Sequence, residues 1–474
     1  MSKEVIAVFD LVRVDMEFLL FDKDYQVLFT RQYQGVKTID DDGDECEDLH
    51  QLTTWIKNTF DEALQNPAFD IQAINFTSFG ASFVHLDDAG IPVTPLYSYL
   101  KHYPEELLDQ FYEKYGSKET IAVETASPPL GMLNSGLQLY WLKHHKPDYF
   151  KNIKRSLHLP QYCSYLITGR RFSEFTGIGC HTDLWNFKEN QYHRWVVEEG
   201  IDALFPPITP TNSYIQLSLG NKKLVAGVGI HDSSAALVCY LLNVEKPFLL
   251  LSTGTWSIAF NPFSKELLNV EDLKHDCLYY LNFLGKPVKA GRLFLGNEHN
   301  FQVKKIAAHF KKDGNYHHQV RFDKSLIQKL IREKNPEKQF IPETMDVSAF
   351  LPQLRRRKVR LDRFESYEEA YHQLNLDLVA LQVISLHLVI GNTKIQKLFI
   401  SGNFCDNQVF IKLLATHYPN LKVYTSVISR ASALGAAAII HLYWNGDRPF
   451  PDIGKVQLHK PEADLEIADY GLMG

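Results

Sequence analysis

The sequence predicts an α/β protein with two domains. Residues 5–9 and 71–76 are apolar runs of strand length, and residues 49–64 between them repeat apolar side chains at helical spacing. That helix is expected to pack on a sheet. A chain of 474 residues allows about two or three domains. A polar break near residue 245 precedes a new apolar strand, so we expect domains at residues 1–245 and 246–474.

Composition excludes several classes of function. The net charge of −6 gives no electrostatic reason to expect binding to nucleic acid or to an anionic membrane. The chain reaches Glu4 too early for a secretory signal, and we expect no apolar run near the ~20 residues that a membrane span needs. The six cysteines are scattered without a C-x-x-C pair, which favours reduced, buried thiols. We therefore expect a soluble cytoplasmic protein.

The chemistry is expected to centre on residues 227–260. His231 and Asp232 follow a glycine-spaced turn, at the start of a predicted helix. Residues 248–251 form a predicted strand that ends in Ser-Thr-Gly-Thr-Trp, a turn whose N–H groups and hydroxyls could hold a phosphate. A carboxylate base and a phosphate turn about 20 residues apart indicate phosphoryl transfer. A helix N-cap aspartate and an ordinary strand-end turn would explain the same residues.

This stretch resembles the middle of FGGY carbohydrate kinases, especially the L-rhamnulose and L-fuculose kinase branch, in its His-Asp-Ser-Ser-Ala and Leu-Ser-Thr-Gly-Thr-Trp segments. The resemblance implies two ribonuclease H-like (actin-like ATPase) domains flanking a cleft. Sugar would bind mainly the first domain, and ATP with Mg²⁺ mainly the second. Asp232 would be the base that deprotonates the sugar hydroxyl. Gly254 and Thr255 would contact the ATP phosphates.

Further matches follow in family order along the chain. The resemblance places Asp10 beneath the phosphates, as a nucleotide and metal ligand, and assigns Gly402 and Asn407 to the adenine site. It assigns sugar contacts to five residues: Phe79, Gly80, Ser82, His231 and Asp232. Gly80 would let a ligand approach bare backbone, although a hairpin or bulge glycine explains it equally well. Ser82 stands where rhamnulokinases have aspartate, so sugar contacts should differ.

Other segments have structural explanations beside the family match. Residues 158–169 and 172–176 resemble the Leu-Thr-Gly sugar-domain segment and its Glu-x-Thr continuation. Tyrosines in residues 97–101 could stack on a sugar, although a surface loop explains them better. Residues 181–183 could reach the site, but a lone histidine near a turn is usually structural. Residues 432–437 supply small side chains for close helix packing, and residues 367–390 predict a long helix buried across the domain interface.

The loop after Asp10 departs from the family pattern, which is roughly Asp-x-Gly-Thr-Thr-x-x-Arg. Here Val12 stands in place of glycine, Val14 supplies no hydroxyl, and Asp15 adds a carboxylate. A carboxylate ~4 Å from a phosphate charge costs on the order of 4 kcal/mol at an effective dielectric constant of 20. This loop predicts poor handling of ATP.

The sequence thus predicts a kinase that transfers the γ-phosphate of ATP to a hydroxyl of a ketose, with a deoxy-ketohexose such as L-rhamnulose or L-fuculose favoured. The alternative is a catalytically impaired protein with the kinase fold that binds sugar or has a regulatory role. Another type of actin-like ATPase would explain the nucleotide fold but not the sugar-domain segment. Expected partners are a small-molecule sugar and ATP, without nucleic acid or membrane, and a homodimer is one option for assembly.

Overall fold

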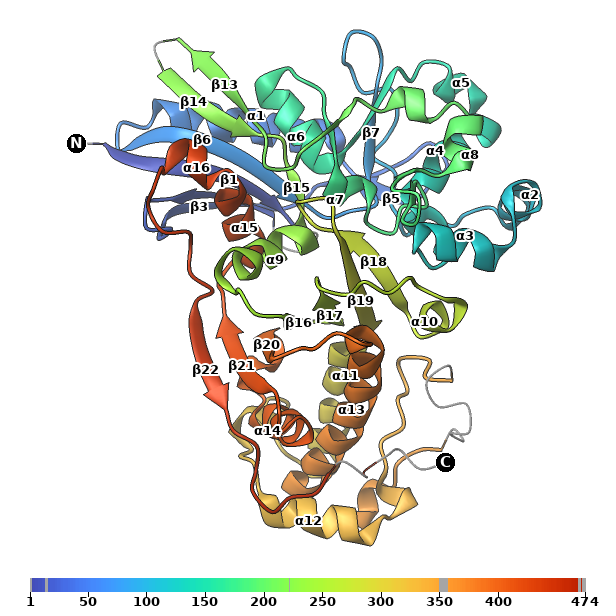
Figure 1. Ribbon diagram of the computed structural model, residues 1–474, viewed down its shortest axis with the longest axis vertical. Helices are drawn as coiled ribbons and strands as arrows, with labels where there is room; N and C mark the ends of the chain where they lie inside the picture. The colour runs from blue at the N-terminus through green and yellow to red at the C-terminus, as the bar shows by residue number, and fades with distance from the viewer. Residues whose placement is uncertain (1, 13–15, 221, 349–356, 468–469, 471–474) are drawn as a thin grey trace.

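The computed structural model describes the chain except residues 1, 13–15, 221, 349–356, 468–469 and 471–474. Two mixed β-sheets, each covered by helices, form two lobes that follow one another along the long axis (Figure 1). The predicted two-domain α/β fold is confirmed.

The first sheet has strand order β13-β14-β6-β1-β2-β3, and β15 also pairs with β6. Strands β1 to β3 are antiparallel neighbours, whereas β6 and β14 run parallel on the other side of β1. The strands are β1 (Lys3–Leu11), β2 (Met16–Phe21), β3 (Val27–Tyr33), β6 (Phe69–Ser78), β13 (Tyr214–Leu219), β14 (Lys222–Gly227) and β15 (Ile230–His231).

Strand β1 is apolar along its length because both of its faces are covered. Its odd-numbered side chains, such as Phe9, pack with helix α1 (Leu49–Gln65). Its even-numbered side chains, Ile6 and Val8, pack with helices on the opposite face of the sheet. The alternation follows from the two-residue period of a strand.

The second sheet repeats the order of the first. Its order is β18-β19-β17-β16-β20-β21-β22, so β19-β17-β16-β20-β21 corresponds to β3-β2-β1-β6-β14. Strands β19, β17 and β16 are antiparallel neighbours, and β20 and β21 run parallel to β16. Thr253 at the end of β16 therefore holds the place of Asp10 near the end of β1. The strands are β16 (Phe248–Thr253), β17 (Ser257–Asn261), β18 (Cys277–Leu281), β19 (Pro287–Leu293), β20 (Lys397–Gly402), β21 (Lys422–Val427) and β22 (Lys455–His459).

Two related helices join the lobes. Helix α9 (Asp232–Asn243) follows the strands of the first sheet, and helix α15 (Ala431–Ile439) follows β21 of the second. They pack against each other so closely that a Cβ on Gly435 would lie under 3.0 Å from the carbonyl oxygen of Ala235. Helix α15 also packs on β1 and β6, where the Asn75 side chain donates a 2.7 Å hydrogen bond to the carbonyl of Ala436.

Figure 1 shows α15 and α16 (His441–Trp444), in red, beside the blue strands of the first sheet. Apolar residues from both predicted domains, including Ile6, Phe248 and Ala433, belong to one buried cluster. The two predicted domains therefore share a buried apolar cluster across the boundary near residue 245.

Helix α13 (Tyr367–Ile390) corrects two sequence expectations. This helix of 24 residues contains an 18-residue window with a mean hydropathy of 1.6. It is long and apolar enough to cross a membrane by length and composition, so the expectation of no such run was wrong. The helix is 72% buried over that window, as the core helix of a folded domain would be. It packs on β17 and β19 and on helices α11 (Leu295–His309), α12 (Lys324–Glu333) and α14 (Gln408–His417). It thus forms the core of the second domain rather than crossing the domain interface.

The remaining elements lie mostly between β6 and β13, as an additional part of the first lobe. They are β4 (Lys37–Ile39), β5 (Glu45–Glu47), β7 (Phe83–Leu86), α2 (Glu105–Tyr115), α3 (Lys118–Thr125), α4 (Ser135–His145), α5 (Pro147–Phe150), β8 (Arg155–His158), α6 (Leu159–Thr168), β9 (Ser173–Glu174), α7 (Phe175–Ile178), β10 (Trp185–Asn186), β11 (Gln191–Tyr192), α8 (Arg194–Glu198), β12 (Ile208–Thr209) and α10 (Val270–Lys274).

Replacing Gly435 with alanine tests the crossing of α9 and α15. Alanine normally stabilises a helix interior by about 1 kcal/mol over glycine. Here the new methyl group would overlap the Ala235 carbonyl, and overpacking costs typically 1–3 kcal/mol or more. We expect a net loss in the free energy of unfolding, measured by urea denaturation. Gly314→Ala, which meets open space, should stay within about 0.5 kcal/mol of the parent. A Gly435→Ala protein as stable as the parent would show that the crossing tolerates a side chain.

Candidate functional site

Two carboxylates meet at one edge of the first sheet. Asp10 lies near the carboxyl end of β1, opposite Thr77 of β6 and Glu17 of β2. Asp232 begins α9, directly after β15 pairs with the end of β6. Burial raises the pKa of Asp10 to about 7, the negative charges of Asp232 and Glu17 add to the rise, and the hydrogen bond from Ser432 opposes it. The electrostatic coupling places the two predicted acids close together.

Asp10 fits the predicted role of a metal ligand. Its Oδ2 accepts a 2.6 Å hydrogen bond from Oγ of Ser432, at the start of α15. Its Oδ1 is buried and has no hydrogen-bond partner among the described residues. Buried carboxylate oxygens are normally satisfied, and Mg²⁺ prefers carboxylate oxygen as a ligand. The unpartnered Oδ1 is therefore a reasonable ligand for Mg²⁺.

Asp232 is the more accessible acid, with a side chain that is 21% exposed. Its Oδ1 accepts a hydrogen bond from the N–H of Ser233 and lies 3.3 Å from Nε2 of His231. His231, and not Asp232, occupies the N-cap position of α9. The helix-capping explanation of Asp232 is therefore wrong, although the predicted position at the helix start is correct.

Gly80 makes room for His231. A Cβ on Gly80 would lie 2.8 Å from Nε2 of His231, so any side chain would push the imidazole away. Burial lowers the pKa of His231, and the charge of Asp232 partly offsets that effect. In this structure the bare backbone at Gly80 accommodates a neighbouring side chain.

Residues of the sugar-domain motif hold the backbone before Asp232. The N–H of His231 donates a 2.9 Å hydrogen bond to Oγ1 of Thr176, which in turn donates to Glu174. Glu174 is fully buried and also accepts from Thr211 and from the N–H groups of Thr176 and Gly177. The Glu-x-Thr pattern thus supports the backbone before Asp232, a role that the sequence alone did not show.

Phe79 and Ser82 do not line an open pocket with Asp232. Their side chains are buried, and they border a crevice of about 20 Å³ together with Tyr97, Ser98 and Tyr99. That volume holds about one water molecule. Their sugar contacts remain predictions.

Glycines build the turn at the end of β16. Gly402 has φ +87°, and a Cβ on it would lie under 3.0 Å from the carbonyl of Thr253. Gly296, at the start of α11, approaches the carbonyl of Gly254 equally closely. The N–H of Asn297 donates to the carbonyl of Thr255, at 3.1 Å. The structure thus brings Gly254 and Gly402 together, and Gly296 is a third member of the turn that sequence reasoning missed.

The turn leaves its outer side accessible. Gly254 is half-buried, and Thr255 and Trp256 are exposed. Backbone groups packed without side chains, beside a free hydroxyl, suit the approach of a phosphate. By strand order, this turn corresponds to the loop between β1 and β2. Arg13, Val14 and Asp15 of that loop lie outside the described residues, so its predicted defects stay a prediction.

Asn407 has a structural role. It is the N-cap of α14: its Oδ1 accepts from the N–H of Phe410, and its Nδ2 donates to Asn375 of α13 at 2.8 Å. Both ends of the amide are therefore occupied. Helix capping explains this residue without a nucleotide, and its place in an adenine site remains a prediction.

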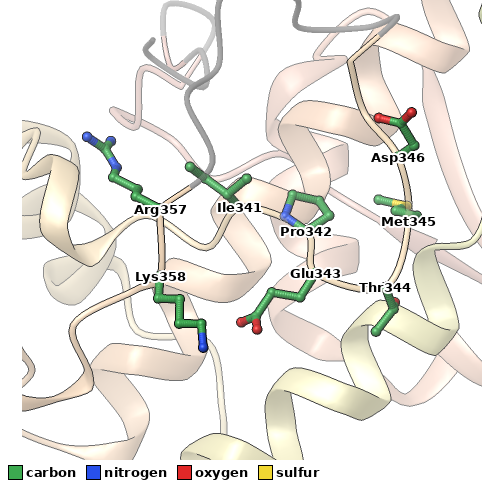
Figure 2. Close-up of a pocket in the computed structure, with 8 residues that line it drawn as sticks. All are labelled: Ile341, Pro342, Glu343, Thr344, Met345, Asp346, Arg357 and Lys358. Carbon is green, nitrogen blue, oxygen red and sulfur yellow. The ribbon is translucent and has the colours of Figure 1, made fainter.

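A hollow of about 520 Å³ in the second domain lies away from these residues. Figure 2 shows its lining, which is formed by residues 341–346 with Arg357 and Lys358. None of these residues belongs to the predicted site. The candidate site is defined instead by the contacts of Asp10 and Asp232 and by the glycine turn at the end of β16.

These features define a two-domain α/β protein of the actin-like ATPase type, with a carboxylate pair where the domains meet and a glycine turn in the second domain. A family model described as "FGGY family of carbohydrate kinases, N-terminal domain" matches residues 5–239. A second, "Carbohydrate kinase FGGY, C-terminal domain", matches residues 245–448. The chain belongs to the FGGY family of carbohydrate kinases.

Individual relatives are distant. A rhamnulokinase from Halalkalibacterium halodurans is 27% identical over 229 residues, covering 46% of this chain and 48% of the relative. One from Oceanobacillus iheyensis is 25% identical over 231 residues, with 47% and 48% covered. The matches thus span about half the length of these curated relatives.

Solved structures agree in fold over nearly the whole chain. A carbohydrate kinase from Novosphingobium aromaticivorans has a TM-score of 0.80 at 24% identity, covering 97% of this chain and 95% of that one. Glycerol kinase from Plasmodium falciparum with ADP has a TM-score of 0.75 at 15% identity, with 97% and 95% covered. At these identities the likeness shows the fold alone.

Asp183 follows the Glu-x-Thr segment in the sequence, but its side chain is directed toward Thr125. It is buried and faces Thr125, whose hydroxyl donates to its Oδ1 at 3.0 Å, while its Oδ2 has no partner among the described residues. Burial raises its pKa to about 8, and the hydrogen bond from Thr125 opposes the rise. The carboxyl group is therefore mostly protonated at neutral pH.

This raised pKa predicts a pH-dependent stability. Between about pH 4 and pH 8 the folded protein keeps a proton that the unfolded chain releases, so stability falls as pH rises through that window, by up to about 6 kcal/mol. Asp183→Asn keeps the shape without ionising, so its stability relative to the parent should increase with pH. Urea denaturation at about pH 5 and about pH 9 measures this. Asp447→Asn, at an exposed site, is the control. Parallel profiles for parent and Asp183→Asn would contradict the assignment.

Proposed function

We propose that the protein is an ATP-dependent kinase that transfers the γ-phosphate to a hydroxyl of a ketose. A deoxy-ketohexose such as L-rhamnulose or L-fuculose is favoured, because relatives named rhamnulokinases match about half of the chain. One observation carries the proposal: Asp232 presents a partly exposed carboxylate beside Asp10, whose Oδ1 is unpartnered among the described residues, where the two domains meet.

The proposed chemistry assigns a task to each group. Asp232 accepts the proton of the acceptor hydroxyl as its oxygen approaches the γ-phosphorus. Thr255 offers its exposed hydroxyl to the nucleotide phosphates. The N–H of Gly254 donates to the carbonyl of Trp256, so the part of Gly254 is to let the phosphates approach backbone that carries no side chain. Asp10 would hold Mg²⁺, which when bound neutralises phosphate charge. Burial of Asp10 keeps its ionisation close to neutral pH, so a bound cation would favour the carboxylate form.

We extend the proposal to the setting of the enzyme. A cytoplasmic protein acting on a small sugar and ATP fits the composition, and a homodimer is one form of assembly to test. The alternative of an impaired kinase rests on Val12, Val14 and Asp15, of which only Val12 is among the described residues. No observation on the described residues favours that alternative.

Asp232→Asn tests the base. Loss of a general base typically lowers turnover by roughly 10² to 10⁴-fold. We expect kcat to fall in that range while sugar binding, followed by thermal shift, stays within a few-fold of the parent. Asp61→Asn, on the exposed side of α1, should leave kcat unchanged. Retained turnover in Asp232→Asn would remove this residue from the mechanism.

Asp10→Asn tests the metal ligand without relying on activity. A ligand at 100 times its dissociation constant stabilises a protein by about 2.7 kcal/mol. We expect MgADP to raise the melting temperature of the parent more than ADP with EDTA does, and this difference to shrink in Asp10→Asn. The difference should also grow with pH as Asp10 ionises. An unchanged Mg²⁺ increment in the variant would place the metal elsewhere.

A further inference from the structure

Arg292 lies beside the phosphate turn and has no role in the site so far. It belongs to β19, where it pairs with Ile258 of β17, two residues after Trp256. Its guanidinium lies over the exposed Trp256 ring, 5.6 Å from the ring centroid. Four residues later, Gly296 packs against the carbonyl of Gly254. The arginine and the turn therefore form one compact unit.

The guanidinium is fixed but not fully used. Its Nε and Nη2 donate to the two carboxylate oxygens of Asp276, at 3.1 and 2.7 Å, and its side chain is only 12% exposed. This fork uses two of the five N–H donors of arginine. Nη1 has no hydrogen-bond partner among the described residues. A nearly buried guanidinium whose remaining N–H groups make no hydrogen bond among the described residues is suited to bind a second anion.

A neighbouring strand of the same sheet reaches the residues beside Asp232. Tyr280, on neighbouring β18, stacks on His231 at 6.3 Å between ring centroids and makes an edge contact with His181 at 6.0 Å. Burial lowers the pKa of His181 to about 3, and the positive charge of Arg292 adds to that effect. Burial raises the pKa of Tyr280, the charge of Asp232 adds to the rise, and the positive charge of Arg292 opposes it. Tyr280 thus contacts His231, the residue before Asp232, from the strand that pairs with the strand of Arg292.

We propose that Arg292 is a further catalytic residue, which donates from Nη1 to a non-bridging oxygen of the γ-phosphate. The inference rests on the proposed function. In the transfer, the acceptor oxygen bonds to the γ-phosphorus and its proton passes to Asp232. The bond from the γ-phosphorus to the bridging oxygen breaks, giving a sugar phosphate and ADP. Arg292 neutralises the charge spread over the transferred group, and Asp276 holds its planar fork in position.

Three variants separate this role from an ordinary ion pair. Arg292→Met removes the donors and the charge, and Arg292→Lys keeps the charge without the fork. Arg360→Met is the matched control, because Arg360 makes the same two-bond contact with Asp362 at an exposed site. Two quantities are measured: kcat with the best acceptor sugar, and the ratio of the dissociation constants of ADP and of a non-hydrolysable ATP analogue.

In Arg292→Met we expect kcat to fall roughly 10³-fold, as for arginines that contact a transferred phosphoryl group. The preference for the ATP analogue over ADP should fall by about tenfold or more, while ADP affinity is retained, because the lost contact is to the γ-phosphate. Arg292→Lys should lie between, and Arg360→Met should match the parent.

The outcomes distinguish this inference from the proposed function. If the parent turns over and Arg292→Met keeps both kcat and the analogue preference, Arg292 is structural and the inference is wrong. If Arg292→Met does not fold, full activity and preference in Arg292→Lys overturn it. If the parent itself neither binds nucleotide nor phosphorylates any sugar, the proposed function fails, and the inference fails with it.

Discussion

The crossing of α9 and α15 is the constraint on which the site depends. Asp232 is the first residue of α9, and Ser432 is the second residue of α15. The close approach of the two helices brings both residues to Asp10. It requires glycine at position 435, because the Ala235 carbonyl occupies the space that a side chain would need. Arg430, just before α15, also pairs with Glu17 of β2 at 2.7 Å. The acid pair is therefore positioned by packing between the domains rather than by either sheet alone.

The second domain solves a similar problem with backbone instead of side chains. The central strand of the first sheet carries Asp10 near its end, whereas that of the second ends at Thr253, whose carbonyl is covered by Gly402. The same strand order thus presents an acid on one side of the molecule and a bare turn on the other. This division suits a reaction in which a proton acceptor and a phosphate holder must face each other.

Local patterns in the sequence predicted much of this arrangement. Strand ends, glycine turns and helix starts are encoded by neighbouring residues, so Asp10, Asp232, Gly254 and Gly402 could be placed on the right elements. Contacts between distant segments could not be predicted in this way. Ser432 and Asp10 are 422 positions apart, and no periodicity links them.

Roles that depend on the surroundings were also beyond the sequence. Asn407 caps a helix because Phe410 and Asn375 happen to face its amide, and a motif cannot show that. Helix α13 is as apolar as a membrane span, yet it is covered by other helices of its domain. Arg292 reads as one more basic residue until Asp276 and Trp256 are seen around it.

The place of α15 in the chain has a consequence for synthesis in the cell. Domains usually fold in order as they leave the ribosome, at about 5–20 residues per second. Here the face of β1 that carries Ile6 and Val8 packs in one cluster with Ala433 and its neighbours, near the end of the chain. Translation from residue 245 to residue 439 takes on the order of 10–40 s at that rate. During that interval the first sheet lacks part of its cover, so the nascent first domain is a natural client for chaperones that bind apolar surface.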